Sequence, residues 1–359
     1  MRTIPWPLAC GACLALMASA AQASRYVVEN LGHAMRGAQV VPLAINEAGI
    51  GVGNATLVDS GEQNAVLLAR GHVEVLPRTG SYSSASGISN GGRVVGTMSS
   101  PSHPDSRAFA WDPHGETRSL GTLGGDTSTG RAVNDAGQMV GGSTLKNGAS
   151  HAFLYDDGRM TDLGTLGGQT SEALAISASG RVAGRAQLRN GDTHAFVWRK
   201  GTMTDLGTLA GDGAGLASIA SAVNDRGIVT GQSSSAGDPG LVHAFRGSAE
   251  SGLQDLGTLA GGQNSFGLGI DEEGDIVGGS EIRGREFHAF IVRAGARGKE
   301  AAQGGSRGDR MMVDLNDELE AASGEGWVLT AATAINQRGQ IVGYGTHRGR
   351  PAAFLLTPR

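Results

Sequence analysis

The chain has 359 residues and a formal net charge of −5 at pH 7, and no stripe of basic residues marks nucleic acid as a partner. Glycine supplies 60 of the residues, about twice its usual share of roughly 7%, and aromatic residues make up only 4%. This composition favours short strands joined by tight turns over helices, and no later apolar run approaches the roughly 18 residues that a membrane-spanning helix needs.

The first 23 residues are typical of a secretory signal peptide. After a basic start, an apolar run extends from Pro7 to Met17, and Ala21-Gln22-Ala23 forms an A-x-A cleavage pattern. We therefore expect residues 1–23 to be removed and the protein to be secreted, with the periplasm as the other possible destination. Both cysteines, Cys10 and Cys13, lie in this segment, so the exported chain is expected to have no disulfide or thiolate chemistry.

From residue 44 onward a ten-residue motif recurs seven times. It consists of an apolar pair, a short polar turn and a second strand, as in AVNDAGQMVG. A hairpin turn needs a residue at positive φ, which glycine adopts without strain, and a preceding Asn or Asp can bond its own backbone. The motif therefore predicts β-hairpins with turn glycines at Gly49, Gly92, Gly137, Gly180, Gly227, Gly274 and Gly339.

A second motif, His-Ala-Phe followed by a turn and Asp-Leu-Gly, alternates with the first. Its full copies open at His151, His194, His243 and His288, and weaker copies without the histidine open at Asn64, Arg107 and Ala352. Most successive copies lie about 45 residues apart, so that one unit holds two hairpins, or four short strands.

Four strands in a repeat of roughly 40 to 50 residues are typical of a β-propeller blade. The sequence thus predicts an all-β fold, a seven-bladed β-propeller of four-stranded blades, formed as a single domain by residues 24–359. The last unit stops after its third strand, AAFLLTPR, whereas residues 25–32 match the pattern of a fourth strand. We expect this N-terminal strand to pair with the C-terminal unit and close the ring, which removes exposed strand edges.

Residues 294–310 interrupt the sixth unit. They consist mainly of glycine, alanine and charged residues, which offer almost nothing to bury. We therefore expect this insertion to be a mobile loop.

The recurrence of His-Ala-Phe with DLGTLGG and AVNDAGQMVG, in fixed order, resembles the HAF-repeat family of predicted extracellular bacterial repeat proteins. The resemblance covers about residues 25–359. It implies secretion and a repeat fold, and the family carries no established reaction. The histidine is missing at Asn64, Arg107 and Ala352, so a role that requires histidine in every blade is not expected.

The repeated histidines and aspartates are the first candidates for chemistry. Pairing Tyr155 with Met160 across the hairpin turn places Phe153 opposite Asp162 and His151 at the start of its strand. The blades of a ring hold such residues well apart, whereas a zinc site needs three or four ligands within about 2.3 Å of one ion. We expect no metal and no cofactor, and a structural role in which each histidine bonds backbone or a neighbouring aspartate. These motif residues are His151, His194, His243, His288, Asp162, Asp205, Asp255 and Asp314.

The connections between hairpins differ from unit to unit, and binding residues concentrate on loops that a rigid scaffold holds. These connections are predicted to form one ligand-binding face beside the histidines. Its candidate residues are Asp126, Thr127, Gln169, Thr170, Asp212, Gln263 and Asn264.

These observations predict a non-catalytic binding or interaction module that is a monomer, with a glycan, a peptide or protein, or a cell-envelope component as its polar ligand. The alternative is an extracellular hydrolase or lyase that acts on a polymer at the mouth of the propeller. The two differ in whether histidines and carboxylates from different blades converge at the centre of the ring or stay within their own blades.

Overall fold

The computed structural model describes residues 25–32, 35, 37–77, 82–100, 103–113, 115–211, 213, 215–238, 240–294 and 312–359. The predicted signal peptide and nearly all of the 294–310 insertion lie outside these ranges.

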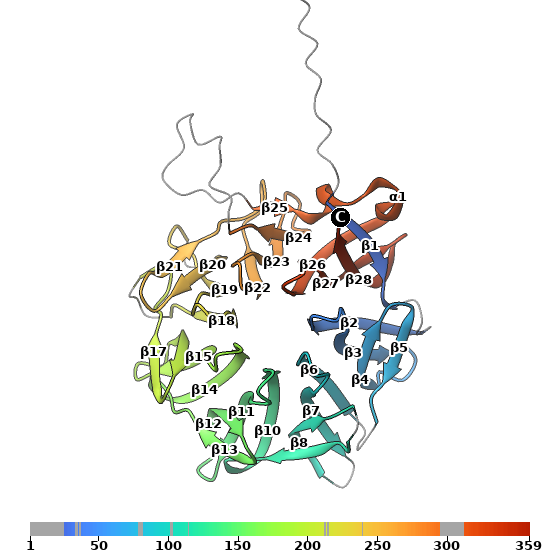
Figure 1. The fold of residues 1–359 in the computed structure, drawn as a ribbon. Helices are drawn as coiled ribbons and strands as arrows, with labels where there is room; N and C mark the ends of the chain where they lie inside the picture. Colours follow the sequence, from blue (N-terminus) through green and yellow to red (C-terminus); the bar gives the residue numbers. More distant parts are fainter. Residues whose placement is uncertain are drawn as a thin grey trace, which may run out of the picture.

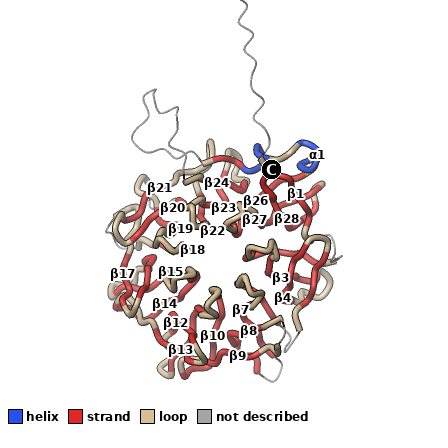
Figure 2. The backbone as a smooth tube through the Cα atoms, viewed as in Figure 1, coloured by secondary structure: helices blue, strands red, loops and turns tan. Residues whose placement is uncertain are grey.

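The described residues form an all-β ring (Figure 1), with a 3-10 turn, η2 (Leu315–Glu318), and a four-residue helix, α1 (Ala321–Gly324), at one place on its rim (Figure 2). Each four-strand unit begins with a strand close to the centre of the ring. These first strands are β2 (Ala38–Ile45), β6 (Tyr82–Ile88), β10 (Gly124–Val133), β14 (Gly167–Ile176), β18 (Ser218–Val223), β22 (Ser265–Ile270) and β26 (Trp327–Ile335).

The other strands follow toward the rim. The second strands are β3 (Gly51–Leu57), β7 (Val94–Ser100), β11 (Met139–Leu145), β15 (Val182–Leu188), β19 (Val229–Ser234), β23 (Ile276–Glu281) and β27 (Ile341–His347). The third strands are β4 (Gln63–Ala69), β8 (His103–Trp111), β12 (Ser150–Asp156), β16 (Thr193–Arg199), β20 (Val242–Ser248), β24 (Phe287–Val292) and β28 (Arg350–Pro358). The outermost strands are β5 (His72–Val75), β9 (Arg118–Gly121), β13 (Arg159–Asp162), β17 (Thr202–Asp205), β21 (Gly252–Asp255), β25 (Val313–Asp314) and β1 (Tyr26–Asn30).

The sheets do not divide as the sequence predicts. Five four-stranded sheets stand as separate blades, not seven, and the remaining eight strands, β10 to β17, form one sheet. Within that sheet β10–β13 and β14–β17 each repeat the four-strand antiparallel order, and a single parallel bridge between Ser150 of β12 and Thr170 of β14 joins the two halves. The prediction of seven separate blades was wrong because Thr170, near the start of β14, forms a bridge with Ser150, the first residue of β12.

The predicted closure of the ring is confirmed. β1 pairs antiparallel with β28 from Tyr26 opposite Pro358 to Asn30 opposite Phe354, so the N-terminal strand completes the sheet of the last unit (Figure 1). The register predicted for the hairpin after His151 is also confirmed, with Tyr155 opposite Met160 and Phe153 opposite Asp162.

The core lies between neighbouring units and not within single sheets. The phenylalanine of the His-Ala-Phe motif is fully buried; Phe196, for example, packs with Val140 and Ala152 of the preceding unit. Burying such a side chain contributes roughly 1.5–3 kcal/mol. Because each phenylalanine sits between two units, the repeat stabilises the ring as a whole.

The inner hairpin turns are also tied to one another. Asn134 Oδ1 accepts the amide N–H of Gln138 at 3.0 Å, and its Nδ2 donates to the carbonyl of Ser177 in the next unit at 3.1 Å. Asn46, Asn224 and Asn336 make the same pair of contacts, and Asn336 Nδ2 donates to the carbonyl of Asn46 at 2.9 Å, which links the last unit to the first.

Asp271 occupies the corresponding place in the sixth unit. It is 5% exposed, and its Oδ1 accepts the amide N–H groups of Gly274 and Asp275 at 2.7 and 2.8 Å. Burial raises the pKa of this carboxyl, and the charges of Asp275 and Glu273 add to the increase, while the backbone hydrogen bonds from Asp275 and Gly274 oppose it. A buried carboxylate thus stands where an uncharged amide stands in four other turns.

An Asp271→Asn variant is expected to be more stable than the natural chain at neutral pH, because it removes a buried charge and restores an amide donor. The folded chain binds the Asp271 proton more tightly than the unfolded chain, so lowering the pH through this pKa stabilises the natural protein selectively. The difference in melting temperature between the two proteins should therefore shrink as the pH falls toward about 4. The reverse substitution, Asn224→Asp, is the matched control and should lower the melting temperature most at neutral pH; a pH-independent difference for both would contradict this account.

Candidate ligand-binding site

Each motif histidine contacts the aspartate of its own unit. His151 Nδ1 lies 2.9 Å from the Asp162 carboxylate, and the other distances are 2.9 Å for His194 and Asp205, 2.8 Å for His243 and Asp255, and 2.6 Å for His288 and Asp314. The same aspartates accept a backbone N–H two residues later, as Asp162 does from Gly164 at 2.8 Å. The histidines therefore stay within their own units and hold the last hairpin to the connection that follows it.

A serine on each of several first strands joins that strand to the preceding unit. Ser171 Oγ accepts the amide N–H of Ala152 at 2.8 Å and donates to the carbonyl of Gly164. Equivalent serines are Ser128, Ser218 and Ser265. Sequence reasoning missed these serines, although their recurrence early in several first strands was a visible signal.

The structure places the residues predicted for the ligand-binding face in different surroundings. Asp126, Gln169 and Gln263 are exposed, and Asp212 lies outside the described residues. Asn264 links two units, since its Oδ1 accepts the amide N–H of Val242 in the preceding unit at 3.0 Å and its Nδ2 donates to Glu281 of its own unit at 2.8 Å.

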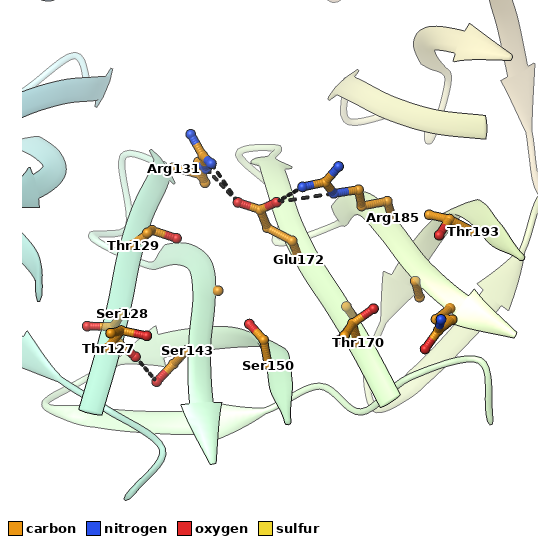
Figure 3. A pocket seen from close by; sticks show the side chains of 14 residues that line it. Thr127, Ser128, Thr129, Arg131, Ser143, Ser150, Thr170, Glu172, Arg185 and Thr193 are labelled. Carbon is orange, nitrogen blue, oxygen red and sulfur yellow. Dashed lines mark hydrogen bonds and ion pairs between the residues drawn. The ribbon is translucent and has the colours of Figure 1, made fainter. Parts of the chain in front are cut away.

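Thr127 and Thr170, by contrast, line the same cavity. It has a volume of about 470 Å³ and lies between the two halves of the eight-stranded sheet (Figure 3). Eleven of the fourteen residues that line it carry a hydroxyl group or a charge. The lining residues are Thr127, Ser128, Thr129, Arg131, Gly142, Ser143, Ser150, Thr170, Ser171, Glu172, Arg185, Ala186, Gln187 and Thr193.

Glu172 lies between two arginines at one end of this cavity (Figure 3). Arg131 contacts its Oε1 with Nε at 2.8 Å and Nη2 at 2.7 Å, and Arg185 contacts its Oε2 with Nη2 at 2.7 Å. Burial acts to raise the pKa of the Glu172 carboxyl, but the charges and hydrogen bonds of Arg131 and Arg185 outweigh it and hold the pKa below its usual value. The carboxyl is therefore an anion that holds one guanidinium group on each side.

The cavity exists because small residues face each other across its sheet. Thr129 pairs with Gly142, and a Cβ on Gly142 would lie 3.4 Å from Glu172 Cγ. In the sixth unit the equivalent pair is Phe266 and Gly279, and there the phenylalanine ring covers the glycine and lies 5.4 Å from the ring of Phe287. The same backbone position is thus filled in one unit and open in another.

Comparing the repeats could have found this site. The first residue of each inner hairpin turn, Asn134 in the unit of Arg131, gives a common reference position. Three residues before this position, Arg131 corresponds to Leu43, Ser86, Leu174, Ser221, Leu268 and Thr333 in the other units. Five residues before it, Glu172 corresponds to Val41, Ser84, Thr129, Ile219, Phe266 and Ala331. A charged side chain stands at each position only once, in adjacent units, which is the departure from the repeat that marks the cavity.

A second cavity adjoins the first. It measures about 330 Å³ and is lined by Tyr82, Ser84, Ser86, Thr97, Ser99 and Ser106 together with Thr129 and Arg131, which also line the first cavity. Tyr82 is 39% exposed. Arg131 therefore lies at the junction of two polar cavities that extend over three successive units.

Carboxylates from different units line one pocket at the inner hairpin turns. Glu47, Asp135 and Glu272 line a shallow pocket of about 220 Å³ there. Each, however, accepts a neighbouring turn's backbone N–H, from Gln337, Asn90 and Asp225 respectively, at 2.7 to 3.0 Å. Over the described ranges, no group of three or more His, Cys, Asp or Glu side chains is placed to hold a metal ion.

A ring of antiparallel sheets defines this protein as a β-propeller. The polar cavity lies between two of its neighbouring units. Its fold is similar to that of a puromycin-hydrolyzing peptidase from Mycobacterium tuberculosis, with a TM-score of 0.58 and 14% sequence identity, over 91% of this chain and 52% of the peptidase. The chain thus spans about half the length of that protein. An oligogalacturonate lyase from Vibrio parahaemolyticus is also similar, with a TM-score of 0.54 and 10% identity, over 92% of this chain and 93% of the lyase.

At these identities the likeness shows the fold alone. No protein-family model matches the chain, and no curated protein matches it. Within the part of the chain that the structure describes, no helix has the length and apolar character needed to cross a membrane.

Proposed function

We propose that this chain is a secreted protein of the HAF-repeat type that binds a polar ligand, without catalysis, in the cavity beside Glu172. The observation that carries the proposal is the wall of this cavity, where hydroxyl groups surround a fixed pair of guanidinium groups. Its volume of about 470 Å³ falls in the range of small-molecule sites, which is roughly 300–1,000 Å³. A glycan, a peptide or a cell-envelope component offers the hydrogen-bonding groups that such a wall would satisfy.

The alternative is an enzyme, a hydrolase or lyase that cleaves an extracellular polymer at the same place. The fold that this chain shares with an oligogalacturonate lyase over nearly the whole of both chains is the observation that favours it. The state of Glu172 favours binding, because a carboxyl that acts as a general acid needs a raised pKa, and this one is lowered by two arginines.

Gly142→Val is expected to abolish ligand binding while leaving the fold intact. The added methyl groups would enter the cavity, whereas the Cβ itself meets Glu172 Cγ at an ordinary 3.4 Å. Binding would be measured by calorimetry with the hits of a glycan and cell-envelope screen, and folding by thermal melting. Gly142→Ala should weaken binding to an intermediate degree.

The same assays distinguish the alternatives. Hits that bind the natural chain and Gly142→Val equally well would contradict the proposed site. Turnover of a bound polymer that is lost in a folded Glu172→Gln variant would overturn the proposal in favour of the enzyme.

A further inference from the structure

The cavity presents positive charge to whatever enters it. Arg131, Arg185 and Glu172 are the charged residues that line it, which leaves one net positive charge. The side chains of Arg131 and Arg185 are 43% and 46% exposed, whereas that of Glu172 is 14% exposed. A ligand therefore meets the guanidinium groups more readily than the less exposed carboxylate, which lies between them with both of its oxygens occupied.

The remaining lining groups suit a sugar. Thr127, Thr129, Ser150, Thr170 and Thr193 carry hydroxyl groups that both donate and accept. Such groups can serve the many hydroxyls of a saccharide, while the planar fork of arginine matches an acidic group such as a carboxylate.

The second cavity supplies what the first lacks, an aromatic surface. Tyr82 presents its ring there, and its Oη accepts a hydrogen bond from Gln63 Nε2 at 3.2 Å, which fixes its position. Since Arg131 and Thr129 line both cavities, a ligand bound at Arg131 lies next to the second cavity as well as in the first.

We propose that the ligand is an acidic oligosaccharide of at least two sugar units, with its acidic group on the exposed faces of Arg131 and Arg185 and a neighbouring sugar on the ring of Tyr82. This inference rests on the proposed function and deepens it, because it assigns the class of ligand and divides the site into two subsites.

The test uses uronic acid oligosaccharides of increasing length, their methyl esters, and sulfated oligosaccharides of neutral sugars as calorimetric probes. The free acids should bind the natural chain more tightly than their esters, and dimers more tightly than monomers. Arg131→Met should weaken binding of the acids on the order of 10- to 100-fold, because it removes a hydrogen bond to a charged group. It should leave binding of the esters nearly unchanged. Binding of the sulfated probes in place of the uronic acids would assign sulfate as the acidic group.

Two further variants separate the subsites from general charge effects. Arg159→Met, on the outermost strand β13, changes the net charge equally and should leave binding unchanged. Tyr82→Ala should remove the advantage of the dimer over the monomer, while Tyr82→Phe, which keeps the ring, should preserve it.

The outcomes distinguish this inference from the proposed function. Equal binding of acids and esters that Gly142→Val abolishes would overturn the acidic ligand and leave the cavity as the binding site. Equal binding of monomer and dimer would overturn the two-subsite arrangement. Binding that neither Gly142→Val nor Arg131→Met changes would overturn both proposals.

Discussion

A chain that lacks residues 25–32 is expected to unfold at a much lower temperature than the complete chain. The deletion removes the whole β1 ladder on β28 and the buried side chains of Tyr26, Val28 and Leu31, which are 1%, 6% and 2% exposed. Loss of a buried aromatic residue alone costs about 3–5 kcal/mol, in a fold whose total stability is expected to be about 5–15 kcal/mol. A decrease on the order of 10 °C or more should be visible in a circular-dichroism melt.

Tyr26→Phe is the control for this deletion. It keeps the buried ring and the strand pairing and loses the hydrogen bond between Arg293 Nη2 and Tyr26 Oη, 3.0 Å long. Its effect should be about 1 kcal/mol. If the deletion melts at the same temperature as the complete chain, β1 does not close the ring.

Gly141→Ala is expected to destabilise the protein by about 3 kcal/mol, which is large for a single added methyl group. The register of β10 on β11 shifts between Gly130 and Ala132, and this brings the carbonyl of Thr129 toward β11. A Cβ on Gly141 would lie 1.8 Å from that carbonyl oxygen and 3.0 Å from Phe153 Cε1. The measurement is the free energy of unfolding from urea denaturation.

The neighbouring Gly142→Ala is the matched control, because its Cβ meets nothing closer than 3.4 Å. It should change the free energy of unfolding by well under half as much. Equal effects of the two substitutions would show that the bulge does not impose the glycine. The same close contact, 1.8 to 2.1 Å, recurs in every unit, at Gly53, Gly96, Gly141, Gly184, Gly231, Gly278 and Gly343.

These glycines end the ten-residue motif that revealed the repeat. The hairpins of this motif could be predicted from the sequence, whereas the need for a glycine at its last position could not. Alternating apolar residues and turn glycines predict the hairpins because both follow from local chemistry. Gly137, for instance, has φ +82°, as its turn requires. The requirement for Gly141 arises from a register shift in the partner strand, and a single motif read alone contains no sign of that shift.

Of the contacts between segments far apart in the sequence, some could be predicted and others could not. The closing strand was predictable because the chain's two ends carry complementary parts of one unit. The merging of β10–β17 into one sheet depends on where Thr170 lies relative to Ser150, which local pattern does not determine. The candidate site was found only in part, through Thr127 and Thr170, because reasoning from the loops overlooked Arg131 and Glu172 on the strands beneath them.

Hydrogen–deuterium exchange of the protein with and without a bound acidic oligosaccharide tests the central claim most directly, because it locates the ligand without any substitution. The account predicts slower exchange on binding in β10, β11, β14 and β15, whose residues line the first cavity, and in β6 for ligands of two or more sugars. Protection confined to β22 and β23, where Phe266 covers the equivalent glycine, or to the outermost strands, would contradict it.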